Sequence, residues 1–283
     1  MKTDCHIHMV LDGVEWKSAI ARHQNGPDEA FIRKTLGIYQ QNGYTYLRDG
    51  GDRWGVGYAA QKLGDEYGIT YRTPGAPLCQ KGCYGSFIGQ TYENLTEYKD
   101  LVLQAKKQGA DFIKIMISGL MDFDRYGVLT QEGLPKEQIH SLIHIAHEEG
   151  FAVMAHCNGG NTALYAAEAG VDSIEHGAYL HKEALDAMAE QNVIWVPTLS
   201  TIGNLRGKGR FQEDAVQAIL KDALENVSYF GKIGGSVACG TDAGAWAVPH
   251  GSETERPLLY QAGLTDEAID QANARIRQRF CQK

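Results

Sequence analysis

The sequence has little of what marks nucleic-acid-binding or membrane proteins. Its 283 residues include 27 Lys and Arg against 35 Asp and Glu, and the basic residues form no tract. A chain of net charge −8 without a basic patch is a poor match to a phosphate backbone. No apolar run approaches the roughly 20 residues that span a bilayer. We therefore expect neither nucleic acid nor a membrane as a partner.

Disulfide frameworks, targeting signals and linkers are also missing. Three of the six cysteines, Cys5, Cys157 and Cys239, fall inside apolar segments, as small buried thiols do. The first eight residues hold no apolar stretch of the kind found in signal peptides, so we expect a cytoplasmic protein. Without a linker, low-complexity tract or repeat, residues 1–283 are expected to form a single domain.

What is present is a regular alternation of strand-like and helix-like segments. Short apolar segments predict eight strands, at residues 2–8, 44–49, 69–73, 111–117, 151–156, 171–176, 193–199 and 236–241. Helical patterns occupy residues 28–42, 94–108, 135–149, 160–169, 181–191, 211–233 and 253–280. Eight such units predict an α/β fold of the (β/α)8 TIM-barrel type, and the doubly wound sheet is the alternative. Long loops at residues 9–27, 74–92 and 200–210 are expected to cover the active face.

Six side chains at or near the ends of these strands carry the functional prediction. They are His6, His8, Lys114, His156, His176 and Asp242. Alone, each has an ordinary explanation, such as a hydrogen-bonded core histidine or a helix-capping aspartate. A barrel gathers the carboxyl ends of its strands at one face, and imidazole and carboxylate groups suit zinc and similar ions. The set therefore predicts a divalent metal site, in which Asp4 is expected to orient an imidazole.

Lys114 is unusual because it lies in the middle of an apolar strand. Burial lowers the pKa of a lysine and favours the neutral amine, which can react with carbon dioxide to form a carbamate. Such a carbamate has two oxygens and can bridge two metal ions. The alternative is a lysine that forms an ion pair with a carboxylate inside the barrel.

Taken together, the motifs resemble the amidohydrolase superfamily of metal-dependent hydrolases. The segment AspCysHisIleHis is similar to its first-strand Asp-x-His-x-His motif. PheIleLysIleMetIleSerGly, AspSerIleGluHisGly, ValProThrLeu and GlyThrAspAlaGly resemble the branch of imidazolonepropionase-like proteins and Xaa-Pro or Xaa-Arg dipeptidases. Members of this branch usually carry a β-sandwich built from both termini, which this sequence lacks. The resemblance thus implies a distorted barrel without that domain.

The resemblance also implies two divalent ions, with zinc favoured. His6, His8, Asp242 and a carbamate on Lys114 would hold one ion, and Lys114, His156 and His176 the other. The ions would lower the pKa of a bridging water, and Asp242 would accept its proton and deliver it to the leaving group. Such a site would cleave an amide, peptide-like, cyclic amide or ester bond of a small-molecule substrate.

Candidate substrate contacts lie on loops at the same face of the predicted barrel. They are His250, Tyr84, Arg125, Tyr126, Tyr179 and Arg206. Arginine and tyrosine side chains can bind a substrate carboxylate. The sequence leaves open a homo-oligomer.

Two other functions remain as alternatives. The first is a mononuclear deaminase or decarboxylase. Deaminases do not need Lys114 and usually carry a glutamate soon after the fifth-strand histidine. In this sequence AsnGlyGly follows His156 and Cys157 instead. The second is a catalytically inactive metal- or ligand-binding barrel. It is disfavoured because all six metal positions hold residues able to bind a metal.

Overall fold

Parallel strands form two sheets in the computed structural model, which describes residues 1–281. The smaller sheet has the order β1 (Lys2–Ile7), β2 (Tyr44–Asp49) and β3 (Thr70–Arg72). The larger sheet has the order β10 (Ser236–Val237), β9 (Ile194–Val196), β8 (Ser173–His176), β7 (Val153–Cys157), β6 (Ile113–Met116), β4 (Leu78–Gln80) and β5 (Gln90–Tyr92). This confirms the predicted α/β class with parallel sheets, but the strands do not pair into one closed barrel.

Backbone hydrogen bonds connect the edges of the two sheets. Cys5 N donates to Cys239 O at 2.9 Å, which joins β1 to the segment that follows β10. Asp111 N, just before β6, donates to Thr73 O at 2.9 Å, just after β3. At the first edge two further bonds follow, from Asp242 N to His6 O and from His8 N to Ala243 O, each at 2.7 Å, although β10 itself has only two residues.

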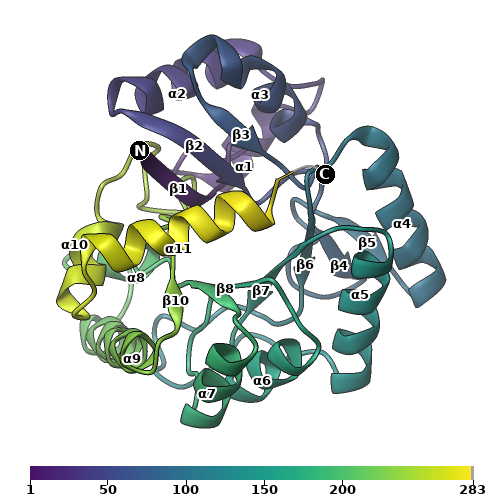
Figure 1. The fold of residues 1–283 in the computed structure, drawn as a ribbon. Helices are drawn as coiled ribbons and strands as arrows, with labels where there is room; N and C mark the ends of the chain where they lie inside the picture. The colour runs from purple at the N-terminus through teal and green to yellow at the C-terminus, as the bar shows by residue number, and fades with distance from the viewer. Residues whose placement is uncertain (282–283) are drawn as a thin grey trace.

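Helices cover the outside of the strands (Figure 1). They are α1 (Trp16–Arg22), α2 (Glu29–Gln41), α3 (Val56–Gly64), the 3-10 turn η1 (Asp65–Tyr67), α4 (Leu95–Gln108), α5 (Lys136–Glu148), α6 (Gly160–Glu168), α7 (Lys182–Glu190), α8 (Ser200–Gly203), α9 (Glu213–Lys232), α10 (Glu255–Gln261) and α11 (Asp266–Arg279). Every predicted strand and helix overlaps an observed one, whereas α3 and η1 lie where no helix was predicted. The segments expected to be loops hold further elements, namely α1, α8, β4 and β5.

Helix α11 lies across the amino ends of the strands (Figure 1). Its residues Ala272 and Ile276, with Phe280 just after it, form one buried apolar cluster with residues from β1, β2, β7 and β9. The ring of Phe280 packs edge-on against Phe112, with centroids 5.3 Å apart. This end of the strands is therefore covered, and the candidate site must lie at the other end.

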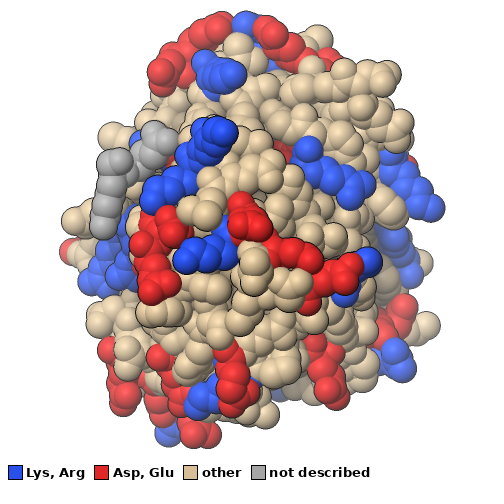
Figure 2. Space-filling model, turned by 90° about the vertical axis from the view of Figure 1, so that its right-hand side faces the viewer, with Lys and Arg blue, Asp and Glu red and all other residues tan. Residues whose placement is uncertain are grey.

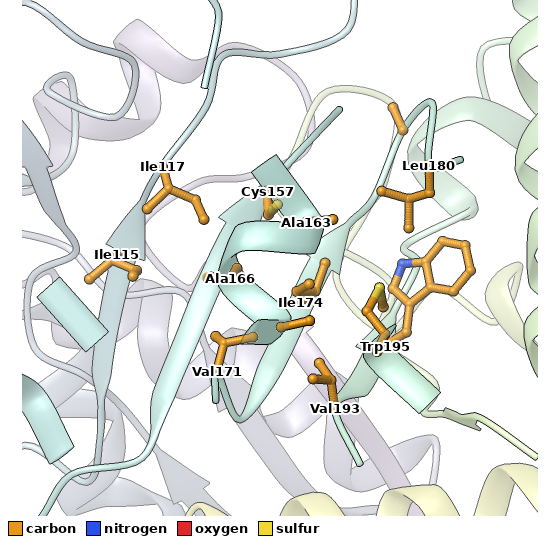
Figure 3. Close-up of a cluster of buried hydrophobic side chains, with 14 of the residues drawn as sticks. Ile115, Ile117, Cys157, Ala163, Ala166, Val171, Ile174, Leu180, Val193 and Trp195 are labelled. Atoms are coloured by element: carbon orange, nitrogen blue, oxygen red, sulfur yellow. The ribbon is translucent and has the colours of Figure 1, made fainter. Parts of the chain in front are cut away.

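Alternation along the strands separates an outer apolar face from an inner polar one. Figure 3 shows outward side chains of β6 to β9 in one buried apolar cluster, among them Ile115, Ile174 and Trp195. Small residues on α6, such as Ala163, let the helix approach the strands closely. The residues between the outward ones point inward, which places charged and imidazole groups inside the molecule.

The outer surface is charged and mixed on the face seen in Figure 2, where acidic and basic residues are interspersed. Ion pairs such as Lys106–Glu149 and Lys136–Glu168 lie on α4, α5 and α6. Among the described residues, no helix combines the length and the hydropathy that crossing a membrane would require.

Candidate metal centre

The six predicted side chains lie on five segments of the chain. His6 is on β1, Lys114 on β6, His156 on β7 and His176 at the end of β8; His8 follows β1, and Asp242 follows β10. The Nε2 atoms of His6 and His8 are 3.4 Å apart. Asp242 Oδ1 lies 3.5 Å from the first of these nitrogens and 3.2 Å from the second. The structure thus brings together residues separated by more than 230 positions.

The other two imidazoles adjoin this group. The ring of His176 lies 5.1 Å from that of His6 and 4.6 Å from that of His156, measured between centroids. His176 Nδ1 is 4.0 Å from Asp242 Oδ2. The four histidines therefore form one continuous cluster around the Asp242 carboxylate.

The donor set fits a divalent cation. Ligand atoms of His6, His8 and Asp242 all lie within 4.8 Å of one another. Among the described residues, Lys114 Nζ, Asp242 Oδ1 and His8 Nδ1 are buried atoms without any hydrogen-bond partner. Burying such groups without partners costs free energy, and the Lys114 amine and the Asp242 carboxylate interact electrostatically, so these two groups are candidates for a shared ligand.

Lys114 is 1% exposed and makes no ion pair or hydrogen bond within the described chain. The structure therefore does not show the ion-paired lysine that the sequence left open. Burial lowers the pKa of Lys114 to about 8, although the Glu175 carboxylate acts in the opposite direction. A lysine with this pKa has a larger neutral fraction near pH 7 than an exposed one.

A buried carboxylate fixes the proton on His6. His6 Nδ1 lies 2.7 Å from Glu175 Oε2, and both side chains are wholly buried. Burial lowers the pKa of His6 to about 4, so the ring is neutral at pH 7. Its single proton lies on Nδ1, where the carboxylate accepts it, and Nε2 keeps its lone pair toward His8 and Asp242.

Arg48 keeps Glu175 ionised. Burial alone would raise the pKa of this carboxyl, but Arg48 Nη2 lies 2.8 Å from Oε1, and the pKa is lowered to about 2. Ser173 Oγ donates a second hydrogen bond to the same oxygen at 2.6 Å. The carboxylate is thus fully paired despite its burial, as a buried charge must be.

His156 and His176 are also neutral and fixed by hydrogen bonds. Burial lowers the pKa of His156 to about 3 and that of His176 well below its ordinary value. His156 Nε2 lies 3.1 Å from Gly119 O, which can only accept, so the proton is on Nε2 and Nδ1 has the lone pair. His176 Nδ1 lies 2.7 Å from Thr198 Oγ1. Each ring thus has its other nitrogen available for a metal.

Two residues of the cluster, His176 and Asp242, have a left-handed backbone conformation. The φ angle is 68° at His176 and 59° at Asp242. Residues other than glycine pay roughly 1 kcal/mol or more for this conformation. Strong hydrogen bonds hold it, since Asp242 N donates to His6 O at 2.7 Å and Gly177 N donates to Cys157 O at 3.0 Å.

The expectation that Asp4 orients an imidazole is wrong. Its carboxylate accepts hydrogen bonds from Thr241 Oγ1 at 2.6 Å and Thr241 N at 2.9 Å. Asp4 therefore holds the turn that carries Asp242, and Glu175 has the orienting role instead. Glu175 is a charged residue inside the buried strand β8 and directly precedes His176. A charge at such a position was a signal that sequence reasoning missed.

Two further positions escaped the sequence analysis. Thr198 has φ 48° and presents its hydroxyl to His176. Gly50 lies against the His8 ring, since a Cβ added there would be 2.3 Å from His8 Cε1. Only a residue without a side chain fits at this position.

Among the predicted substrate contacts, two tyrosines adjoin the cluster. The Tyr84 ring lies 4.7 Å from that of His156, between centroids. Tyr179 lines a small pocket together with His176 and Asp222. Tyr126 is 52% exposed, packs edge-on against Tyr179 and donates to Asp222 Oδ1 at 3.2 Å.

The other three make no hydrogen bond or ion pair with the cluster in the part of the chain that the structure describes. His250 has both nitrogens engaged, Nε2 with Leu11 O at 2.9 Å and Nδ1 with Tyr39 Oη at 3.1 Å. Arg125 forms an exposed ion pair with the neighbouring Asp122. Arg206 is exposed and donates to the carbonyl of Gly203 at 3.2 Å.

Comparison with known proteins places this geometry in context. The amidohydrolase family model matches residues 65–271. Ochratoxinase from Aspergillus niger is 26% identical over 319 residues, which cover 96% of this chain and 63% of that protein. The chain thus spans less than two thirds of the length of this curated relative.

Solved structures of similar fold include two hydrolases. A Xaa-Pro dipeptidase with bound methionine in its active site is 21% identical, with a TM-score of 0.80, over 98% of this chain and 74% of that one. The crystal structure of the A. niger ochratoxinase is 23% identical, with a TM-score of 0.79, over 99% of this chain and 71% of that one. At these identities the likeness shows the fold.

Proposed function

The chain belongs to the amidohydrolase family, and on that premise we propose that it is a metal-dependent hydrolase acting on a small molecule. The bond cleaved is an amide, peptide-like, cyclic amide or ester bond. The likeness to a Xaa-Pro dipeptidase favours an amide among these. The two sheets are proposed to form one (β/α)8 domain, supported by the backbone hydrogen bonds that connect their edges.

The single observation that carries this proposal is the amine of Lys114, which is buried beside the histidine cluster without a partner. A neutral amine attacks carbon dioxide, forming an N–C bond and releasing one proton, and the product is a carbamate anion. That anion gives two oxygens to a cluster otherwise made of four imidazoles and one carboxylate. Charge and donor number then suit two divalent ions.

In this arrangement His6, His8 and Asp242 would hold one ion, His156 and His176 would hold the other, and the carbamate on Lys114 would supply ligand oxygens. When bound, two divalent ions, for which zinc suits the donor set, supply the Lewis acidity that activates water and polarises a carbonyl. Glu175 keeps the proton of His6 on Nδ1, and Thr198 orients His176. Both rings are therefore fixed before any ion binds.

Asp242 is proposed as the proton carrier of the reaction. Its pKa is lowered: burial opposes ionisation, but the His6 and His8 rings and the Lys114 amine favour the carboxylate. Its Oδ1 atom is buried and has no hydrogen-bond partner. Asp242 Oδ1 can accept the proton of the attacking water and return it to the leaving nitrogen.

The test is reconstitution of the metal-free protein with zinc or manganese, with and without ¹³C-bicarbonate. We expect close to two ions per chain, a carbamate signal in the ¹³C NMR spectrum and hydrolysis of N-acyl amino acids. In Lys114→Ala, metal, signal and activity should all be lost, and a short carboxylic acid that fills the space should restore metal binding.

The outcomes separate the alternatives. One ion with an unmodified lysine would overturn the binuclear site and favour a mononuclear deaminase or decarboxylase. No metal under any condition would leave a ligand-binding barrel.

A further inference from the structure

A row of aromatic side chains leads from the molecular surface to the candidate metal centre. Trp16, the first residue of α1, is 48% exposed, and its ring packs edge-on against Phe87 with centroids 5.5 Å apart. The Phe87 ring lies 5.9 Å from that of Tyr84, and Tyr84 lies 4.7 Å from His156. Trp16, Phe87 and Tyr84 are called the aromatic row below.

The aromatic row is held in place by polar contacts to its backbone. Tyr84 N donates to Gln131 Oε1 at 2.9 Å. Arg53 donates to the carbonyl oxygens of the residues just before and just after Phe87, at 3.1 and 2.9 Å. Segments far apart in sequence therefore fix the rings before any ligand arrives, which reduces the entropy lost on binding.

The row is only partly used for packing within the described chain. Tyr84 and Phe87 are half-buried, and nearly half of the Trp16 side chain is exposed. An aromatic ring that serves only the core is usually covered, and small-molecule sites are typically lined by aromatic side chains. The inner end of the row touches His156, so a molecule lying along it has one end at the proposed reaction centre.

We propose that the aromatic row binds an aromatic ring of the substrate, attached close to the bond that is cleaved. A substrate ring could pair with any of these three rings. Aromatic pairs gain more binding free energy than the burial of apolar area alone provides. This inference rests on the proposed function, and it narrows the substrate class to amides that carry an aryl group. A saturated ring of equal size would bury similar area without the ring–ring interaction.

The experiment compares phenyl and cyclohexyl substrates on the metal-loaded full chain. N-(phenylacetyl)glycine and N-(cyclohexylacetyl)glycine test the acyl side, and N-acetylphenylalanine and N-acetylcyclohexylalanine test the amine side. We expect kcat/KM to favour the phenyl member of at least one pair by about threefold to tenfold, the range of one aromatic pair. In Phe87→Leu this preference should disappear. In the matched control Phe123→Leu, from a ring pair with Phe211 in another loop, it should remain.

A binding measurement separates failure of this inference from failure of the proposed function. Calorimetry of phenylacetate and cyclohexylacetate with wild type and Phe87→Leu needs no turnover. Tighter binding of phenylacetate to wild type, lost in Phe87→Leu, would support the row even if no amide were hydrolysed. Hydrolysis with equal kcat/KM within both pairs, or a preference that survives in Phe87→Leu, would overturn it.

Discussion

The Nδ1 atom of His6 lies 2.7 Å from the Oε2 atom of Glu175, and neither side chain is exposed to solvent. The contact joins a candidate metal ligand to a charge that is paired with Arg48 on the adjoining sheet. Because it fixes both the tautomer and the orientation of the imidazole, Glu175 would act on an ion bound by His6 without touching it.

Replacing Glu175→Gln should therefore weaken metal binding and lower stability together. We expect metal affinity to fall by about 10–100-fold. The free energy of unfolding should fall by about 3–5 kcal/mol, because Arg48 loses its buried partner. Metal titration and chemical denaturation measure the two effects. The control Glu253→Gln breaks the exposed pair with Lys2, and its stability should change by less than about 1 kcal/mol. Unchanged metal affinity in Glu175→Gln would contradict the orienting role.

Adding one methyl group at Gly50 should displace His8. The new Cβ would lie 2.3 Å from His8 Cε1, so the ring must move. We expect Gly50→Ala to lose metal affinity by at least about tenfold, as measured by competition with a chromogenic chelator. Gly37, inside helix α2, is the control, because a Cβ added there would be 3.9 Å from its nearest neighbour, Tyr67 Cε1. Gly37→Ala should keep its metal affinity and gain up to about 1 kcal/mol of stability. Equal affinities in both variants would remove His8 from the ligand set.

Asp242→Asn should separate catalysis from metal binding. The amide retains an oxygen at this position but accepts no proton from water, so kcat should fall by about 10²–10⁴-fold. Metal content in excess zinc should remain close to that of wild type. Steady-state kinetics with parallel metal analysis gives both values. Asp122→Asn, on an exposed loop, serves as the control and should keep its kcat. An active Asp242→Asn protein would exclude Asp242 as the proton carrier.

Glu255 should make stability depend on pH. Burial raises its pKa from 4.5 to about 8, against hydrogen bonds from Leu199 and Ser200. Between these two values the folded state binds more protons than the unfolded state, so the free energy of unfolding falls as pH rises from about 4.5 to about 8. The expected loss is on the order of a few kcal/mol. Glu255→Gln does not titrate, and its stability should fall less over the same range in urea denaturation. Parallel curves for the two proteins would contradict the raised pKa.

The sequence predicted the strands and the six cluster residues because both depend on local pattern. Apolar runs mark buried parallel strands, and a polar residue at the end of such a run marks the face where the strands meet. The candidate cluster could be found in this way because each member, such as His156, stands out against its own segment.

The rest depended on contacts between distant segments. Arg48 and Glu175 are 127 residues apart, and no local pattern pairs them. Strands β4 and β5 have three residues each, too few to show a period. Tertiary packing, rather than local sequence, determines these pairings and short strands.

The position of helix α11 also affects the order of events during synthesis and folding. Phe280 packs on Phe112 and, with its ring 4.4 Å from the guanidinium, on Arg48. Every strand precedes α11 in the described chain, so synthesis produces all six residues of the candidate centre before the helix that covers the far end of the strands. Until α11 docks, water can reach Arg48 and weaken its pairing with Glu175. We therefore expect the candidate metal centre to be completed late, when α11, which contributes none of its six residues, has docked.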